Sequence, residues 1–185
     1  YMFFHVNAAH LLINVAGILC FGAIAYRELD ARDGERKSDA AVSFIAFFLI
    51  SGMAAAAFYV LTSPDSYRPM IGASGGAAGI AGAVVLIFAR QDWPGLPFSK
   101  AANTAIIAAA VTAALAALNV VLYFCFDFLL DLLQSKKILL EHLFQWRILL
   151  NTWLGAASAW KAHGAGYVFG MLAFPLFERM AGARR

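Results

Sequence analysis

The chain has 185 residues, of which 62% are hydrophobic and only 14% are charged. Its mean hydropathy of +0.73 lies far above that of a water-soluble domain, which excludes a soluble globular protein. We therefore expect its surface to contact membrane lipids. The net charge of +3 at pH 7 does not indicate a nucleic-acid partner, because the basic residues lie in connectors and at the tail, where membrane topology explains them.

Uninterrupted apolar runs predict five membrane-spanning helices, because about 20 helical residues cross a hydrocarbon core of roughly 30 Å. We therefore expect an all-α, polytopic helical bundle in which residues 1–185 form a single transmembrane domain. The chain opens on Tyr1 within what reads as a helix start, so we also expect an N-terminal part that precedes it. The predicted spans are 2–26, 40–61, 74–89, 101–126 and 162–177.

The connectors predict the orientation of the bundle. Residues 27–39 and 90–100 and the C-terminal tail carry Arg and Lys, so we expect all three on the cytoplasmic side. Residues 127–161 are Leu-rich but interrupted by charges such as Asp131 and Lys136, which favours an amphipathic helix at the interface over a sixth span. The Ala-rich spans and short connectors suggest a bacterial inner membrane, with a mitochondrial inner membrane as the alternative.

The first predicted span carries polar side chains that are costly in lipid. His10 and Asn14 are four positions apart and so project from one face of a helix, whereas His5 would point about 140° away from His10. His10 and Asn14 thus form a pair of donors facing one site. The alternative interpretation is that these groups only hydrogen-bond to a neighbouring helix.

The third predicted span begins with a glycine-rich segment around a serine. Gly72, two residues before Ser74, permits a left-handed backbone, and Gly75, Gly79 and Ala83 form a stripe of small residues on one helical face. Such a stripe lets a neighbouring helix approach closely. Ser74 itself could be a reactive hydroxyl or a plain helix N-cap.

The last predicted span begins near His163, with Gly166 and Gly170 on the same helical face. If the third and fifth spans pack through their small-residue stripes, His163 and Ser74 come within hydrogen-bonding range. That is the arrangement of base and nucleophile that acyl transfer needs, because an unassisted serine hydroxyl is a poor nucleophile at neutral pH. The His10 and Asn14 side chains and the Ser74 backbone N–H would then serve as donors to a tetrahedral oxyanion.

Two other classes of membrane protein fit less well. Ion-coupled transporters and pumps usually need an Asp, Glu, Lys or Arg in the middle of a span, and no predicted span has one. A haem or metal protein could use His5, His10 and His163, but His5 and His10 would diverge on one helix and no HExxH motif is present. We therefore predict no cofactor and no metal.

Three segments, taken in order, resemble the motifs of rhomboid proteases, a family of intramembrane serine proteases. The resemblance extends over nearly the whole chain, and three motifs on three separate spans are far more specific than any one alone. The segments are His5-x4-His10-x3-Asn14, Gly72-Ala73-Ser74-Gly75 and Ala162-His163-x2-Gly166-x3-Gly170, which resemble HxxxxHxxxN, GxSG and AHxxGxxxG.

The resemblance implies a role for each of these residues. Ser74 would be the nucleophile and His163 the general base and acid, in a dyad without an acidic third member. His10 and Asn14 would line the oxyanion hole, and His5 would be mainly structural. The motif glycines would be structural as well: Gly72, Gly75, Gly166 and Gly170.

The resemblance also implies a reaction, the hydrolysis of a peptide bond in or near a transmembrane helix. Substrates would be single-pass or other transmembrane proteins that enter laterally from lipid, beside the 101–126 span. The alternative function is that of a non-catalytic rhomboid-like protein that binds transmembrane clients, although such relatives typically lose the serine or the histidine, and this chain has both.

The chain departs from the family pattern in two places. The family core has six spans, and its first span and the loop after it have no counterpart here. The 127–161 stretch is an insertion, longer than the loop expected before the last span, and its role as a cap, a gate or a docking surface stays open.

Overall fold

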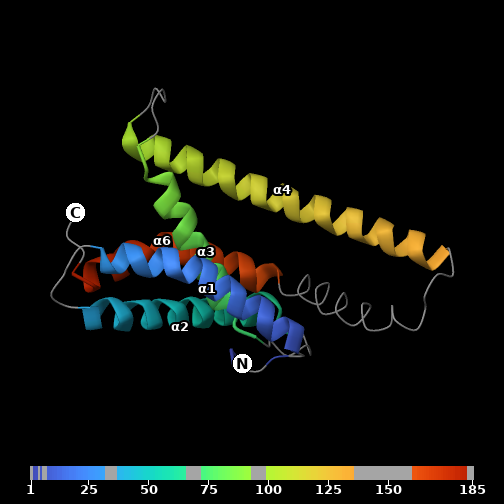
Figure 1. Ribbon diagram of the computed structural model, residues 1–185, viewed down its shortest axis with the longest axis horizontal. Helices are drawn as coiled ribbons and strands as arrows, with labels where there is room; N and C mark the ends of the chain where they lie inside the picture. The colour runs from blue at the N-terminus through green and yellow to red at the C-terminus, as the bar shows by residue number, and fades with distance from the viewer. Residues whose placement is uncertain are drawn as a thin grey trace. The chain divides into compact units, whose positions relative to one another are not determined.

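The protein is all-α over the residues that the computed structural model describes. These residues are 2–3, 5, 8–31, 37–65, 72–92, 99–135 and 160–182, with side chains described except at 9, 37, 38 and 118–135. The helices are α1 (Ala8–Asp30), α2 (Lys37–Thr62), α3 (Ser74–Ala89), α4 (Lys100–Ser135) and α6 (Trp160–Met180) (Figure 1).

Each described helix overlaps one of the five predicted spans. Within the residues that the structure describes, three segments are long and apolar enough to cross a membrane: His10–Asp30 in α1, Asp39–Thr62 in α2 and Lys100–Ala117 in α4. Helix α3 is apolar but shorter. The prediction of an all-α membrane protein is therefore confirmed.

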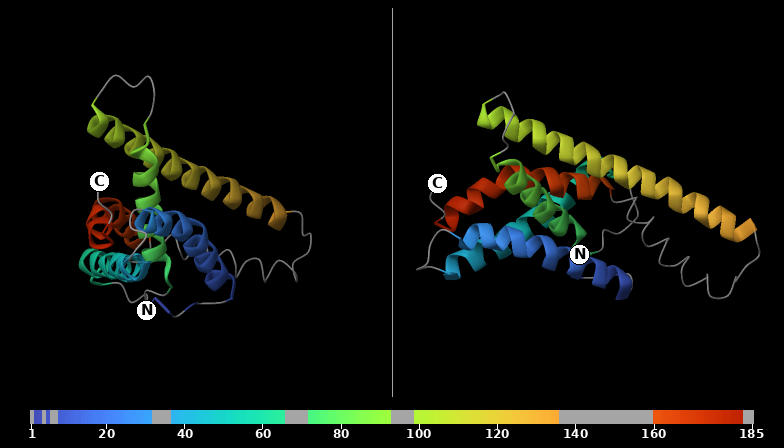
Figure 2. Two further views of the ribbon diagram at one scale, coloured as in Figure 1. Left: turned by 60° about the vertical axis from the view of Figure 1, so that its left-hand side comes forward. Right: turned by 45° about the horizontal axis from the view of Figure 1, so that its top comes forward.

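The chain divides into two compact units. Residues 1–88 and 153–185 form the first, and residues 89–152, which include α4, form the second. Within the first unit α1, α2 and α6 run side by side, and α3 crosses them steeply (Figure 2). Helices α2 and α6 make the most extensive of the helix contacts described. The first unit contains all three motifs identified in the sequence.

Aromatic side chains join α2 to the second half of α6. Phe47 and Phe174 are fully buried, and the Phe47 ring meets Phe174 and Phe177 edge-to-face, with centroids 5.3 and 5.2 Å apart. Such aromatic pairs contribute about 0.5–1.5 kcal/mol each beyond the area they bury. They hold one end of α6 against α2.

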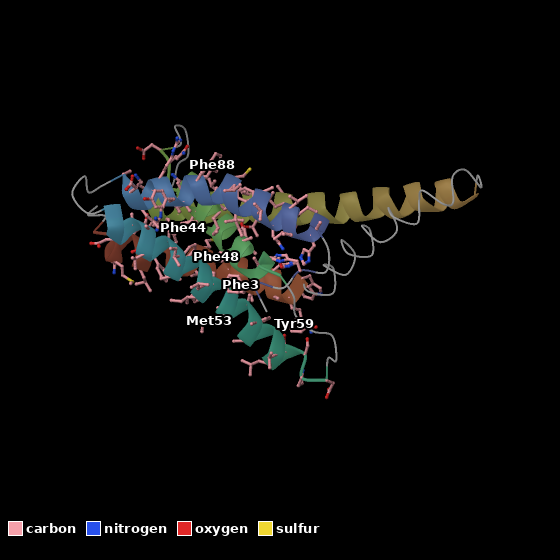
Figure 3. All side chains as sticks on the ribbon, turned by 60° about the horizontal axis from the view of Figure 1, so that its bottom comes forward. Phe3, Phe44, Phe48, Met53, Tyr59 and Phe88 are labelled. Carbon is pink, nitrogen blue, oxygen red and sulfur yellow. The ribbon has the colours of Figure 1, made fainter. Side chains whose placement is uncertain are left out.

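Two further rings of α2 face the other helices of the unit (Figure 3). Phe44 meets Tyr26 of α1 edge-to-face, with centroids 6.0 Å apart, and a Cβ at Gly22 would lie 3.0 Å from its Cζ. Phe48, one turn later, lies against Gly76 of α3, where a Cβ would come within 2.7 Å of the ring. The absence of side chains at these glycines makes room for the rings.

Two predicted boundaries are wrong. The first span was expected to begin at residue 2, but α1 begins at Ala8. The fourth was expected to end at residue 126, with an interfacial helix after it, but α4 continues unbroken to Ser135. Charged residues end an apolar run without interrupting backbone hydrogen bonds, so a helix can continue past them. The rest of the predicted interfacial segment, 136–159, lies outside the described residues.

Candidate active site

Ser74 is the first residue of α3 and is not its N-cap. The Ala73 carbonyl accepts the first helical hydrogen bond, from the Ala77 N–H at 3.0 Å, which makes Ala73 the capping residue. The Ser74 hydroxyl is therefore not engaged as a helix cap. It lies at the positive end of the helix dipole, where developing negative charge is stabilised.

The turn before Ser74 requires glycine for two reasons. Gly72 has φ of 104°, in the left-handed region that other residues rarely adopt. A Cβ there would also lie 2.7 Å from Cε1 of His10 and 3.2 Å from Nδ2 of Asn14. The side chains of His10 and Asn14 thus lie directly beside the segment that leads into the serine.

The small-residue stripes of α3 and α6 meet, which is the condition for bringing His163 to Ser74. The Gly75 carbonyl contacts Gly166, and the Gly79 backbone contacts Gly170, so closely that a Cβ on either α6 glycine would collide with the facing backbone. Close contact of this kind is typical of helices that pack through small residues. At a third crossing point, which was not predicted from the sequence, Gly82 contacts the Tyr167 backbone.

This packing brings the serine and the last motif histidine together. Nε2 of His163 lies 2.8 Å from Oγ of Ser74, although the two residues are 89 positions apart in the chain. Both side chains are partly buried. In the neutral ring with its proton on Nδ1, Nε2 accepts the serine O–H. That contact is the one a nucleophile and its general base make.

Asn14 has a donor that is buried and available. The residue is only 6% exposed, and its Nδ2 has no hydrogen-bond partner among the described residues. Burying a donor without a partner costs roughly 1–3 kcal/mol, so such groups are uncommon in folded proteins outside functional sites. Its position beside Gly72 directs this donor toward the segment that precedes Ser74.

The predicted position of His5 is wrong. His5 was expected to point away from His10, but the two rings meet edge-to-face with centroids 5.3 Å apart. The helical projection does not apply because α1 begins only at Ala8.

Over the described part of the chain, no three His, Cys, Asp or Glu side chains lie close enough to hold a metal ion.

Lys161 also belongs to this region, although the sequence did not predict it. Lys161 lies two residues before His163 in the chain. Its ammonium donates to the Thr62 carbonyl and to the Ser63 hydroxyl, each at 3.1 Å. The sequence feature that could have identified Lys161 is its place in the first turn of a helix, where the helix dipole disfavours a positive charge unless a partner stabilises it.

The family model described as the Rhomboid domain matches residues 1–179. No curated protein and no solved structure matches the chain. Because the family model extends over nearly the whole sequence, the chain belongs to the rhomboid family.

Proposed function

We propose that this protein is an intramembrane serine endopeptidase in which Ser74 is the nucleophile and His163 the general base. The observation that carries the proposal is the 2.8 Å contact between Ser74 Oγ and His163 Nε2. Membership of the rhomboid family, which includes intramembrane serine proteases, supports it.

The proposed reaction has two halves. Oγ of Ser74 attacks the substrate carbonyl carbon while Nε2 of His163 accepts the hydroxyl proton. Donors from Asn14, His10 and the Ser74 backbone N–H stabilise the oxyanion, after which His163 gives its proton to the leaving amine. A water molecule then hydrolyses the acyl-enzyme by the same steps, with His163 again as the base.

The proposed substrates are transmembrane proteins that enter laterally from lipid. A helix in lipid has all its backbone groups hydrogen-bonded, so the segment to be cut must unwind locally to present a carbonyl. Residues such as Gly, Ser and Pro near the scissile bond make this easier. The membrane in which this takes place is, in our proposal, the inner membrane of a bacterium.

Labelling by a fluorophosphonate probe tests the proposal. The wild-type protein in detergent should become labelled, because the probe reacts with an activated serine. Ser74→Ala and His163→Ala should both lose labelling while their thermal unfolding midpoints stay close to that of the wild type. Ser43→Ala is a matched control, since Ser43 is a buried serine of α2 outside the site, and it should be labelled like the wild type.

The alternative is a non-catalytic rhomboid-like protein that binds transmembrane clients. A folded wild type that resists the probe would favour this function over proteolysis. Labelling that persists in Ser74→Ala would show that another residue reacts, and would refute the proposed site.

A further inference from the structure

Lys161 bears a charge that its own helix does not stabilise. It lies in the first turn of α6, whose N-terminal end carries partial positive charge. Its side chain instead reaches α2, where Nζ donates to the carbonyl of Thr62 and the hydroxyl of Ser63.

The end of α2 suits this ammonium. Thr62 is the last residue of α2, and the last four carbonyls of a helix have no partner within the helix. These carbonyls also form the negative end of the dipole, where lysine is favoured. The side chain thus links the C-terminal end of α2 to the N-terminal end of α6.

The two residues after Lys161 continue this contact into the candidate site. Ala162 is 1% exposed and packs with Ala55 and Tyr59 of α2. His163 then reaches Ser74 on α3. Consecutive residues of α6 therefore meet the end of α2, the side of α2 and the nucleophile.

Apart from Ala162, the buried residues of α6 lie after His163 in the chain. Where α6 meets α3, the backbones of Gly75 and Gly166 and of Gly79 and Gly170 are in contact. The aromatic contacts of Phe47 lie in the second half of α6, against Phe174 and Phe177. The directional bonds from Lys161 supply an axial constraint beside the histidine.

We propose that Lys161 is a positioning residue that sets the axial position of α6 and so holds Nε2 of His163 on the hydroxyl of Ser74. The inference rests on the proposed function of the dyad. Misplacement of a catalytic group by about 1 Å can lower a rate by on the order of 10²-fold. Loss of the lysine should therefore slow the chemical step.

The test compares three variants in the rate of fluorophosphonate labelling at several probe concentrations. Lys161→Met should lower the maximal labelling rate roughly tenfold or more, with the half-saturating concentration little changed, because the base is displaced and the probe site remains. Lys161→Arg, which keeps the charge and the donors, should restore most of the rate. Lys100→Met is the matched control, since Lys100 forms an exposed ion pair with Asp92 in the other unit, and it should label like the wild type.

A double-mutant cycle gives an independent measurement. Ser63→Ala removes one acceptor and should cause a smaller loss than Lys161→Met. Because both changes break the same contact, adding Ser63→Ala to Lys161→Met should cause no further loss. Full additivity of the two losses would overturn the proposed link.

The outcomes separate this inference from the proposed function. An unlabelled wild type would remove both. A labelled wild type and a Lys161→Met variant with the same maximal rate per folded molecule would overturn the positioning role alone. A lower thermal unfolding midpoint with an unchanged rate would make Lys161 a purely structural link and would also overturn it.

Discussion

Asn14 is the residue at which a structural role and the proposed catalytic role are most easily separated. Its Nδ2 is buried without a hydrogen-bond partner among the described residues. Replacing Asn14 with leucine, of similar size, therefore breaks no hydrogen bond between Nδ2 and these residues. We expect Asn14→Leu to unfold close to the wild-type temperature while its rate of peptide hydrolysis falls roughly 10²- to 10³-fold, as for the loss of one oxyanion donor. Unchanged hydrolysis would show that Nδ2 does not contact the oxyanion.

A second prediction at this scale concerns Gly72. Alanine there would strain a backbone with φ of 104° and place its Cβ against His10. We expect Gly72→Ala to lose most probe labelling even in protein that remains folded, as judged by circular dichroism. Gly164→Ala is the control, because Gly164 adjoins His163 and has nothing within 4 Å of a Cβ. Equal labelling of both variants would contradict the assigned role of the turn.

Individual residues differed in how far the sequence could predict them. Ser74 and His163 could be paired from sequence because glycine spacing on two helices implies a close crossing, and the contact of the two side chains agrees. The contact of His5 with His10 could not, because it depends on where α1 begins. The bonds of Lys161 could not either, since they join residues 98 and 99 positions apart without a motif.

At the scale of elements, the crossing of α3 and α6 determines whether the site forms. A Cβ at Gly79 would meet Ser51 of α2 as well as the carbonyl of Gly166, at 3.2 Å. We expect Gly79→Ala to destabilise the protein by about 1–3 kcal/mol, the usual effect of overpacking, measured as a lower unfolding midpoint in detergent.

The matched control for this element is Gly17→Ala on α1. A Cβ at Gly17 would have nothing within 4 Å, and alanine is the better helix former, so the unfolding midpoint should stay the same or rise. If both variants shifted the midpoint equally, the effect would come from the loss of glycine itself and not from the crossing.

The elements were easier to predict than their ends. Apolar length located five helices because lipid selects continuous hydrophobic runs. The end of α4 could not be predicted because the apolar run ends at residue 126, whereas the helix continues to Ser135. Which faces pair could be predicted for α3 and α6 from their glycines. The pairing of Phe44 and Phe48 with glycines of α1 and α3 could not be predicted, because large apolar residues occur on every face of α2.

At the scale of the whole molecule, many large apolar side chains are exposed on the surface. Leu12 of α1, Val42 of α2 and Leu172 of α6 are each at least 65% exposed, a surface that suits lipid and not water. We expect the full-length protein to stay in the membrane pellet after alkaline carbonate extraction. Its release into the supernatant would show that it is attached peripherally and would contradict the membrane fold.

The separation of 89 positions between Ser74 and His163 has a consequence for biosynthesis. Helix α6 leaves the ribosome after α1, α2, α3 and α4, so the serine is made without the histidine it contacts. At about 5–20 residues per second, the delay between the two residues is roughly 4 to 18 s. A nascent chain therefore has no assembled dyad, and the proposed protease activity would begin only after α6 has been inserted.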